Sequence, residues 1–194
     1  MPRPSNKEQI RRAALECFAE RGYDGTRIAD IARRAGVSVA ALYNHYRSVQ
    51  DLAEELYLTN FVAYADELAG ILSDVEDVEE AARLVIQATL ARYRHDPAAF
   101  TFVTQRLPTF LRTMPEDVVL PLTSLQHLVE RGQRSGTVRP GVPVLIASLF
   151  LGALLRVFYL NDFTALHGFT LTVEHDRTIE DACLAILRPE AGVR

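Results

Sequence analysis

The chain has 194 residues, enough for one sizeable core or for a small domain joined to a larger one. Its charge is divided unevenly along the sequence. Residues 1–50 carry nine Lys and Arg against five Asp and Glu, net +4, and the remainder carries twelve against twenty, net −8, which together give the overall −4. Only the N-terminal part therefore suits a polyanion, and the overall acidity excludes a protein that coats nucleic acid indiscriminately.

The two cysteines, Cys17 and Cys183, fall in helical patterns far apart and show no metal-ligand spacing, which is typical of a reduced compartment. The N-terminus lacks an apolar signal region. The longest apolar run, 144–160, is interrupted by polar residues and is shorter than the roughly 20 residues of a membrane span. We therefore expect a cytoplasmic protein with no membrane partner, no metal and no cofactor.

The first predicted helices are short. One covers residues 10–20, and the next starts after Thr26, whose hydroxyl can cap free backbone N–H groups. Apolar residues of this second helix, among them Ile28 and Ile31, recur on one face at helical spacing. Gly36 follows where the chain must turn sharply, because glycine alone adopts a positive φ without steric cost. The pattern predicts a helix that stops at a glycine turn.

Ser38 is placed to cap a third helix after this turn. Leu42 and Tyr46 lie four residues apart and are expected to face inward, which leaves small and polar residues on the outward face. A helix-turn-helix lays its second helix in the major groove, where small residues allow close approach and polar tips reach phosphates and base edges. The segment therefore indicates DNA reading, against the alternative of a plain three-helix packing unit.

Residues 10–57 resemble the DNA-binding domain of the TetR family of bacterial transcriptional regulators. The resemblance rests on an ordered set of positions: Gly22-Tyr23, Thr26, Ile31-Ala32, Ala35-Gly36-Val37-Ser38, Leu42-Tyr43, His45-Tyr46 and Asp51-Leu52. It implies that Ser38, Tyr43 and His45 contact phosphates and that residues 39–41 approach bases.

The chain departs from the family pattern at three positions. Val39 stands where a basic residue is frequent, Ala41 where a threonine or serine is, and Val49 where a lysine is. Several cations could replace part of the lost phosphate attraction, namely Arg27, Arg33, Arg34, Arg47 and the N-terminal arm residues Arg3, Lys7, Arg11 and Arg12. Of these we favour Arg27 and Arg47, with thymine methyl contacts or DNA shape contributing at the apolar positions. The predicted DNA-binding residues are Arg27, Ser38, Val39, Ala40, Ala41, Tyr43, Asn44, His45 and Arg47.

The rest of the chain predicts an all-helical array with short connections. Ser48, with Asp51 three residues later, starts a long helix, and further helical patterns end near Asp96-Pro97 and at Gly136. The predicted fold class is all-α, with about nine helices in total. An N-terminal three-helix DNA-binding domain with a helix-turn-helix (1–50) is followed by a larger helical ligand-binding and dimerisation domain (51–194).

The last two long helices are candidates for a dimer seam. The helix over 143–161 is apolar on most sides, and a final helix, expected to be capped by Thr178 with Asp181, has a clean apolar stripe. The two symmetric half-sites of a palindromic operator require two DNA-binding domains, which favours a homodimer joined through these helices. The alternative is that both are ordinary core helices of a monomer. The predicted dimer-interface residues are Ser148, Gly152, Ile179, Ala182, Cys183 and Ile186.

The resemblance also implies that a small molecule binds among the middle helices and that its binding releases the DNA-binding domains from the operator. A pocket with apolar walls and few polar groups would suit a largely apolar effector. The alternative for each candidate residue is that it only packs in the core. Arg156 stands out, because a charge in an apolar helix needs a partner. The predicted effector-binding residues are Phe61, Tyr64, Tyr93, Phe102, Gln105, Phe110, Gln126, His127, Arg156 and Tyr159.

The expected function is a homodimeric repressor that binds double-stranded palindromic operator DNA and leaves it when the effector binds. A second interpretation is a protein with the same DNA-binding domain whose larger domain binds a protein partner instead of a small molecule. A third reading is an enzyme, for which the candidate residues are His167, Glu174, His175 and Asp176. Their spacing matches no metal signature and no nucleophile motif accompanies them, so no catalytic residue is predicted.

Overall fold

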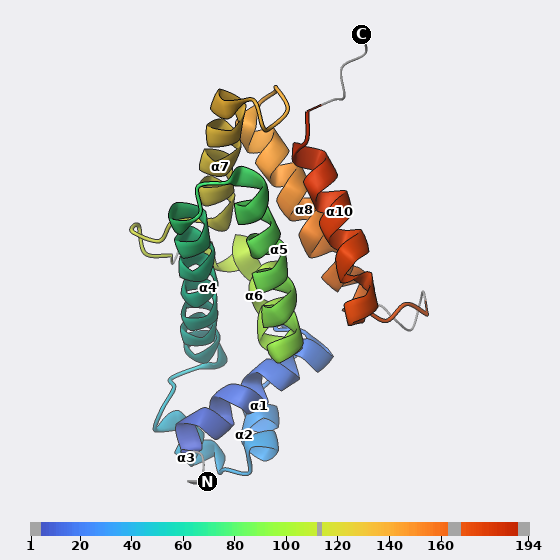
Figure 1. Cartoon of the computed structure of the whole chain (residues 1–194). Helices are drawn as coiled ribbons and strands as arrows, with labels where there is room; N and C mark the ends of the chain where they lie inside the picture. Colours follow the sequence, from blue (N-terminus) through green and yellow to red (C-terminus); the bar gives the residue numbers. More distant parts are fainter. Residues whose placement is uncertain (1–4, 112–113, 163–167, 190–194) are drawn as a thin grey trace. The chain divides into compact units, whose positions relative to one another are not determined.

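The computed structural model of the chain describes residues 5–111, 114–162 and 168–189, with the side chains of residues 107, 108 and 162 excepted. This part of the chain contains nine α-helices and no strand, which confirms the predicted all-α class (Figure 1). The α-helices are α1 (Asn6–Arg21), α2 (Ile28–Ala35), α3 (Val39–Tyr43), α4 (Val49–Asp74), α5 (Val78–His95), α6 (Pro97–Phe110), α7 (Pro121–Ser135), α8 (Pro143–Asp162) and α10 (Asp176–Leu187).

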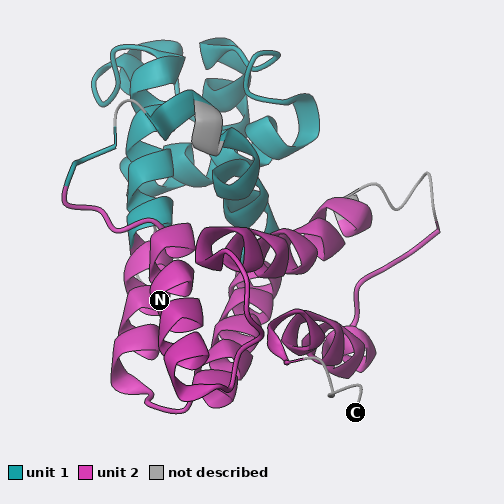
Figure 2. Ribbon diagram, turned by 90° about the horizontal axis from the view of Figure 1, so that it is seen from above, with its two compact units in different colours: residues 1–62, 96–116 teal, residues 63–95, 117–194 magenta. Residues whose placement is uncertain are grey.

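Backbone contacts divide the chain into two compact units (Figure 2). Unit 1 comprises Met1–Val62 and Asp96–Glu116, so it holds α1, α2, α3, the first half of α4 and all of α6. Unit 2 comprises Ala63–His95 and Asp117–Arg194. The domain boundary expected at residue 50 stays a prediction. The long helix α4 runs through residue 62 without a break and therefore contributes to both units.

The head of unit 1 is formed by α1, α2 and α3. Ser5 and Glu8 form a capping box at the start of α1: the Ser5 hydroxyl accepts the Glu8 N–H, and the Glu8 carboxylate accepts the Ser5 N–H. The core of the head consists of fully buried side chains from all three helices, including Ile10, Ile31 and Leu42. α6 packs against α1 inside the same unit, so the head is not a separate three-helix body.

Thr26 is buried, but it does not cap α2 as the sequence had suggested. The residue that precedes α2 is Arg27, whose backbone N–H donates to the Asp30 carboxylate (3.4 Å). The Thr26 hydroxyl points the other way and donates to the carbonyls of Gly22 (2.7 Å) and Cys17 (3.2 Å). Thr26 therefore stabilises the end of α1 through its hydroxyl.

Replacing Thr26 with valine is expected to lower the free energy of unfolding by about 1–2 kcal/mol, because valine keeps the volume but leaves buried carbonyls without their donor. Urea unfolding followed by circular dichroism measures the change. The matched control is Thr59→Val in α4 of the same unit, where the side chain is exposed. Equal stability of the two variants would mean that the hydrogen bonds of Thr26 contribute nothing.

The start of α4 follows the predicted capping pattern with one difference. The Ser48 hydroxyl accepts the Asp51 N–H (3.0 Å), as expected. The Asp51 carboxylate reaches back one residue further than in the usual box and accepts the N–H of Arg47 (3.0 Å). This fixes the backbone of Arg47, two residues before α4 begins.

Unit 2 is built from the second half of α4 together with α5, α7, α8 and α10. α8 packs against both α7 and α10, and α5 also contacts α10 and α7. Two ion pairs connect α5 to α10, Arg83 with Glu180 and Arg94 with Asp176. The expected cap at Thr178 is wrong, since a short 3₁₀ helix (Val173–His175) leads directly into α10 at Asp176 and leaves Thr178 inside the helix.

From the sequence alone, the apolar run 144–160 is too short to span a membrane. The helix that contains this run, α8, is longer. The stretch Pro143–Asn161 is long and apolar enough to cross a membrane by length and composition alone. A single helix of this kind is weak evidence, because helices buried in protein pass the same test. Only 28% of the stretch is buried inside the chain, so a large part of its apolar surface has no cover from this subunit.

Candidate DNA-binding site

The turn between α2 and α3 has the geometry that the sequence predicts. Gly36 adopts a left-handed conformation (φ 68°) at the end of α2, and its N–H returns to the carbonyls of Ala32 and Arg33. The Val37 N–H also donates to Ala32 (3.0 Å). The Ser38 hydroxyl then accepts the Ala41 N–H (3.0 Å), which confirms its capping role. These bonds hold α3 at a fixed angle to α2.

The inner face of α3 is anchored as predicted. Leu42 is fully buried and Tyr46, just after the helix, is 2% exposed. The Tyr46 hydroxyl donates to the Glu55 carboxylate in α4 (3.0 Å). Burial, and then this hydrogen bond to a carboxylate, raise the pKa of Tyr46, so the hydroxyl stays protonated and keeps the bond.

The outer face of α3 is open to solvent. Tyr43 is 53% exposed and Val39 is 39% exposed, both high values for large apolar or aromatic side chains. The remaining predicted contacts on this face, Ser38, Ala40, Asn44 and His45, are also exposed, and Ala41 is half-buried. An exposed aromatic hydroxyl, an amide and an imidazole beside small residues form a surface able to approach the major groove.

Most cations of the head are already paired with carboxylates. Arg12 pairs with Glu16, and Arg33 with Asp30. Arg34 holds Glu20 through two hydrogen bonds, and these bonds lower the pKa of that carboxyl. Lys7 and Arg11 share Glu55, so the cations of α1 and of the C-terminal half of α2 have partners inside the unit.

Arg27 and Arg47 differ from these cations. Both are exposed, and within the described part of the chain no carboxylate lies within ion-pair distance of either guanidinium. Arg27 directly precedes α2, and Arg47 follows the last residue of α3 by four positions. Unpaired guanidinium groups at these places are free to bind phosphates. Arg3, another candidate of the N-terminal arm, lies outside the described residues.

The ten residues predicted to bind an effector fall into separate groups. In unit 1, Phe61, Phe102 and Phe110 are buried, whereas Gln105 is exposed. The three phenylalanines belong to an aromatic cluster in which neighbouring ring centroids are 4.7–6.3 Å apart. The members of this aromatic cluster are Phe18, Tyr23, Tyr57, Phe61, Phe102 and Phe110.

Tyr57 of α4 is not among the residues predicted from the sequence to bind an effector. Its side chain is fully buried beside Phe110 (centroids 4.7 Å apart) and Phe61. No described residue offers its hydroxyl a hydrogen bond. Burial raises the pKa of this hydroxyl. A buried donor without a partner costs free energy, and is therefore a place where a ligand acceptor would be stabilised.

In unit 2 the remaining candidates are also dispersed. Tyr64 is buried and hydrogen-bonded to Thr89 (3.1 Å); since Thr89 donates its own proton to Val85, Tyr64 is the donor. Burial raises the pKa of Tyr64 to about 12. The Tyr93 hydroxyl accepts the amide of Asn161 (2.6 Å). These two tyrosines have internal partners.

The other three polar candidates of unit 2 lie near its surface. Gln126 is half-buried and bonded to Glu130, and His127 is exposed. The partner expected for Arg156 is a ring of its own helix, and its role in effector binding stays a prediction. Arg156 is exposed, and its guanidinium stacks 4.3 Å above the ring of Tyr159.

The residues predicted for the dimer seam divide into two sets. Ser148, Gly152 and Ala182 are exposed, and Ile186 is half-buried. Ile179 and Cys183 are buried within the subunit, and burial raises the pKa of the Cys183 thiol to about 11. The apolar stripe of α10 thus serves this subunit's own core, where α10 packs on α8 and α5. An exposed seam would be carried by α8.

The residues weighed for an enzyme do not converge. His167 lies outside the described residues. His175 accepts the Thr172 N–H through Nδ1 (3.1 Å), and Asp176 is engaged by Arg94. Among the residues that the structure describes, no group of three His, Cys, Asp or Glu could hold a metal ion.

A reading helix held on a glycine turn, two unpaired arginines beside it and a second helical unit define a DNA-binding, ligand-responsive regulator of transcription. Comparison with known proteins agrees. Residues 10–56 match the model of the family described as bacterial regulatory proteins, tetR family. An uncharacterized HTH-type transcriptional regulator of Mycobacterium tuberculosis is 30% identical over 152 residues, covering 74% of this chain and 75% of the relative. The chain belongs to the TetR family.

Two further relatives bear on the fold and the function. The fatty acid metabolism regulator protein of Bacillus subtilis is 25% identical over 143 residues, covering 72% of this chain and 74% of that protein. The solved structure of AibR in complex with isovaleryl coenzyme A and operator DNA matches with a TM-score of 0.73 at 18% identity, covering 95% of this chain and 98% of that one. At this identity the AibR structure is evidence for the fold alone.

Proposed function

We propose that the chain is a cytoplasmic, homodimeric repressor that binds a palindromic operator through α3 and leaves it when an effector binds. The observation that carries the proposal is the exposed face of α3 together with Arg27 and Arg47, two exposed cations that no carboxylate neutralises in the described chain. Phosphate contacts from these arginines and from Ser38, Tyr43 and His45 would set the register, and residues 39–41 would face the base edges.

The effector proposed is an acyl compound with a largely apolar body, such as an acyl-coenzyme A. Relatives named for fatty acid metabolism and the isovaleryl coenzyme A of the AibR complex support this class. Within unit 1 the aromatic cluster supplies apolar walls, and the unpartnered hydroxyl of Tyr57 supplies one polar anchor. α6, which carries Phe102 and Phe110, packs on α1 of the reading head.

Contacts between α6 and the helices of the head would transmit the effect of effector binding to the DNA-binding surface. Phe102 stacks on Phe18 of α1 (5.0 Å between centroids), and Arg106 lies over the ring of Tyr23 and pairs with Asp24 (3.5 Å). A ligand shifts the position of the head only as far as it prefers one arrangement of these contacts. Separation of Phe102 from Phe18 would be the structural change to look for.

The first test is selection of bound fragments from the source genome by the purified protein at near-physiological salt. Enrichment of a single palindrome supports the proposal, and dissociation of that fragment by an acyl-coenzyme A supports the effector class. A folded protein that enriches no sequence contradicts specific operator binding, whatever its response to ligands.

Replacing Tyr57 with phenylalanine separates ligand binding from packing. Removal of the unpartnered hydroxyl is expected to raise the free energy of unfolding of the ligand-free protein by about 1 kcal/mol, because its desolvation cost disappears. The same variant should need roughly tenfold more effector for release from the operator, the loss of one hydrogen bond in an apolar site. Urea unfolding and operator release by an acyl-coenzyme A series measure the two effects.

The control for Tyr57→Phe is Tyr64→Phe, which removes a hydroxyl that donates to Thr89. Here the expected change has the opposite sign, a loss of about 1 kcal/mol in stability. If Tyr57→Phe were also destabilising, its hydroxyl would have a partner in the folded protein. If the effector response were unchanged, Tyr57 would not contact the effector.

A further inference from the structure

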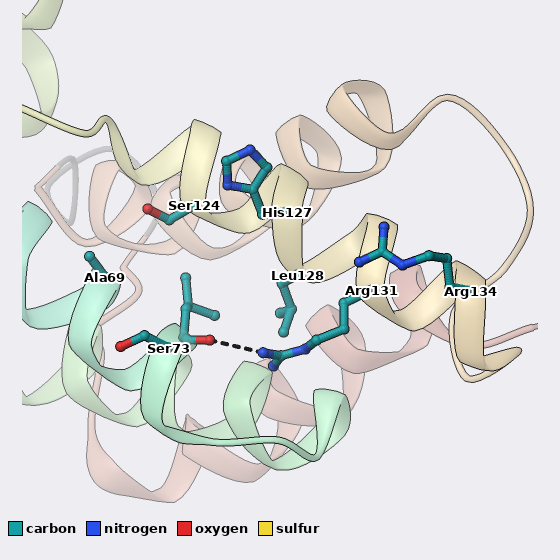
Figure 3. A pocket seen from close by; sticks show the side chains of 8 residues that line it. Ala69, Ser73, Ser124, His127, Leu128, Arg131 and Arg134 are labelled. Carbon is teal, nitrogen blue, oxygen red and sulfur yellow. Dashed lines mark hydrogen bonds between the residues drawn. The ribbon is translucent and has the colours of Figure 1, made fainter.

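A cavity of about 330 Å³ opens between α4 and α7 in unit 2 (Figure 3). This volume is at the lower end of small-molecule sites. The end of α4 and one side of α7 from Ser124 to Arg134 form its walls, with Ala69, Leu72 and Leu128 as the apolar part. The aromatic cluster of unit 1 contributes no residue to it.

The polar part of the cavity is basic. His127, Arg131 and Arg134 follow one another along α7 at spacings of four and three residues, which place them on one side of the helix. Arg131 extends from α7 to α4, where it donates to the carbonyls of Leu72 (3.1 Å) and Val75 (2.7 Å). Figure 3 draws the first of these two bonds. The Nε–H of Arg131 is buried and has no acceptor among the described residues.

Among the described residues, no carboxylate forms an ion pair with these three side chains. Carbonyl oxygens carry no net charge, so the guanidinium of Arg131 keeps its full positive charge. The acidic residues adjacent in sequence accept hydrogen bonds from neutral donors and keep their charge: Asp74 accepts the Ser73 hydroxyl (3.0 Å) and Glu130 accepts the Gln126 amide (2.8 Å). Within the described ranges, neither these nor any other carboxylate lies within ion-pair distance of His127, Arg131 or Arg134.

An unneutralised basic cavity is unusual in this part of the chain, where residues 51–194 carry a net charge of −8. Uncompensated cations around a concave surface focus positive potential and attract anions. Two guanidinium groups provide planar sets of N–H donors that match the oxygens of a phosphate group. The hydroxyls of Ser73 and Ser124 line the same cavity and can supply further donors.

We propose that this cavity binds the phosphate group of a small molecule, with Arg131 and Arg134 as its direct anchors. The site is separate from the aromatic cluster and does not depend on the effector proposed above. Because Arg131 holds the last carbonyls of α4, a phosphate bound there competes for the guanidinium that caps this helix. The bound anion would therefore act on α4, the helix that also belongs to unit 1.

Isothermal titration of the full chain with inorganic phosphate, at constant ionic strength set by chloride, tests the proposal. Saturable binding is expected for the wild type, and Arg134→Gln should weaken it about tenfold. Arg134 is exposed and has no ion pair in the described chain, so its replacement leaves the fold intact. The matched control is Arg177→Gln in α10, a side chain that is 93% exposed and does not line the cavity.

Coenzyme A and dephospho-coenzyme A distinguish the source of the phosphate, and only this comparison rests on the proposed effector class. Binding of coenzyme A more than tenfold tighter than phosphate, and lost without its 3′-phosphate, assigns the site to the coenzyme. Binding of coenzyme A no tighter than phosphate assigns it to free phosphate. Absence of saturable binding for both probes, or equal binding by Arg134→Gln, overturns the site. Operator selection is measured separately, so failure of one proposal leaves the other testable.

Discussion

Replacing Arg27 and Arg47 together with glutamine is expected to weaken operator binding by about two to three orders of magnitude at 0.15 M salt. Each substitution occurs twice in a dimer, so four phosphate contacts are lost. Because each contact contributes about 0.9 to the slope of log affinity against log salt, the slope should fall by about 4. Fluorescence anisotropy with the selected operator over a series of salt concentrations measures both quantities.

The control for this variant has the same change of charge. Arg12→Gln with Arg33→Gln also removes two cations from each head, but both arginines are exposed and paired, with Glu16 and Asp30. These carboxylates retain other partners, Arg34 for Glu16 and Arg21 for Asp30, so the cost in stability stays within about 1 kcal/mol. The control should lose little affinity. Equal losses in the two double variants would mean that the field of the whole head, and not contacts from Arg27 and Arg47, attracts the DNA.

The reading head could be predicted from the sequence because its signals are local. A glycine at the end of an apolar helical stripe, followed by a serine, fixes both the turn and the next helix within four residues. Gly36 and Ser38 do this in the structure, with the expected left-handed φ and the expected side-chain bond to Ala41. The buried positions Leu42 and Tyr46 follow from helical spacing alone.

The direction of a side chain is harder to predict from the sequence when two neighbouring helices both offer it hydrogen-bond partners. Thr26 precedes α2 and follows α1, and the sequence favours a cap on the helix ahead. The structure gives its hydroxyl to the carbonyls of Gly22 and Cys17 because the chain folds back here and buries the residue. Burial is a tertiary property, and residue spacing does not report it.

The candidate effector residues show the same limit on a larger scale. Helical periodicity identifies an apolar stripe but does not say whether its aromatics pack together or line a cavity. Phe61 and Phe102 enter one cluster, whereas Tyr64 and Tyr93 have partners of their own. The unpartnered hydroxyl of Tyr57 and the basic cavity beside α7 depend on distances between segments far apart in sequence. Neither has a local signal.

Leu149→Asp is expected to convert the protein to a monomer. Leu145 and Leu149 of α8 are 56% and 55% exposed in the single chain, beside Ser148 and Gly152. A Cβ added at Gly152 would meet open space within this chain, so the small residues there are not required by the subunit's own packing. Small residues beside exposed leucines allow a second α8 to approach closely. In such a symmetric interface one substitution buries two aspartates, each without a partner.

Sedimentation velocity would show whether Leu149→Asp remains a dimer, and anisotropy would show its affinity for the operator. Loss of the second head should cost at least about 100-fold in affinity, because the two half-sites are no longer bound as a linked pair. Val173→Asp is the control: Val173 is 68% exposed and lies outside α8, so neither property should change. A folded Leu149→Asp protein that stays dimeric would place the seam elsewhere. In that case the apolar surface of α8 would need another cover, and docking of a different protein would become the better explanation for it.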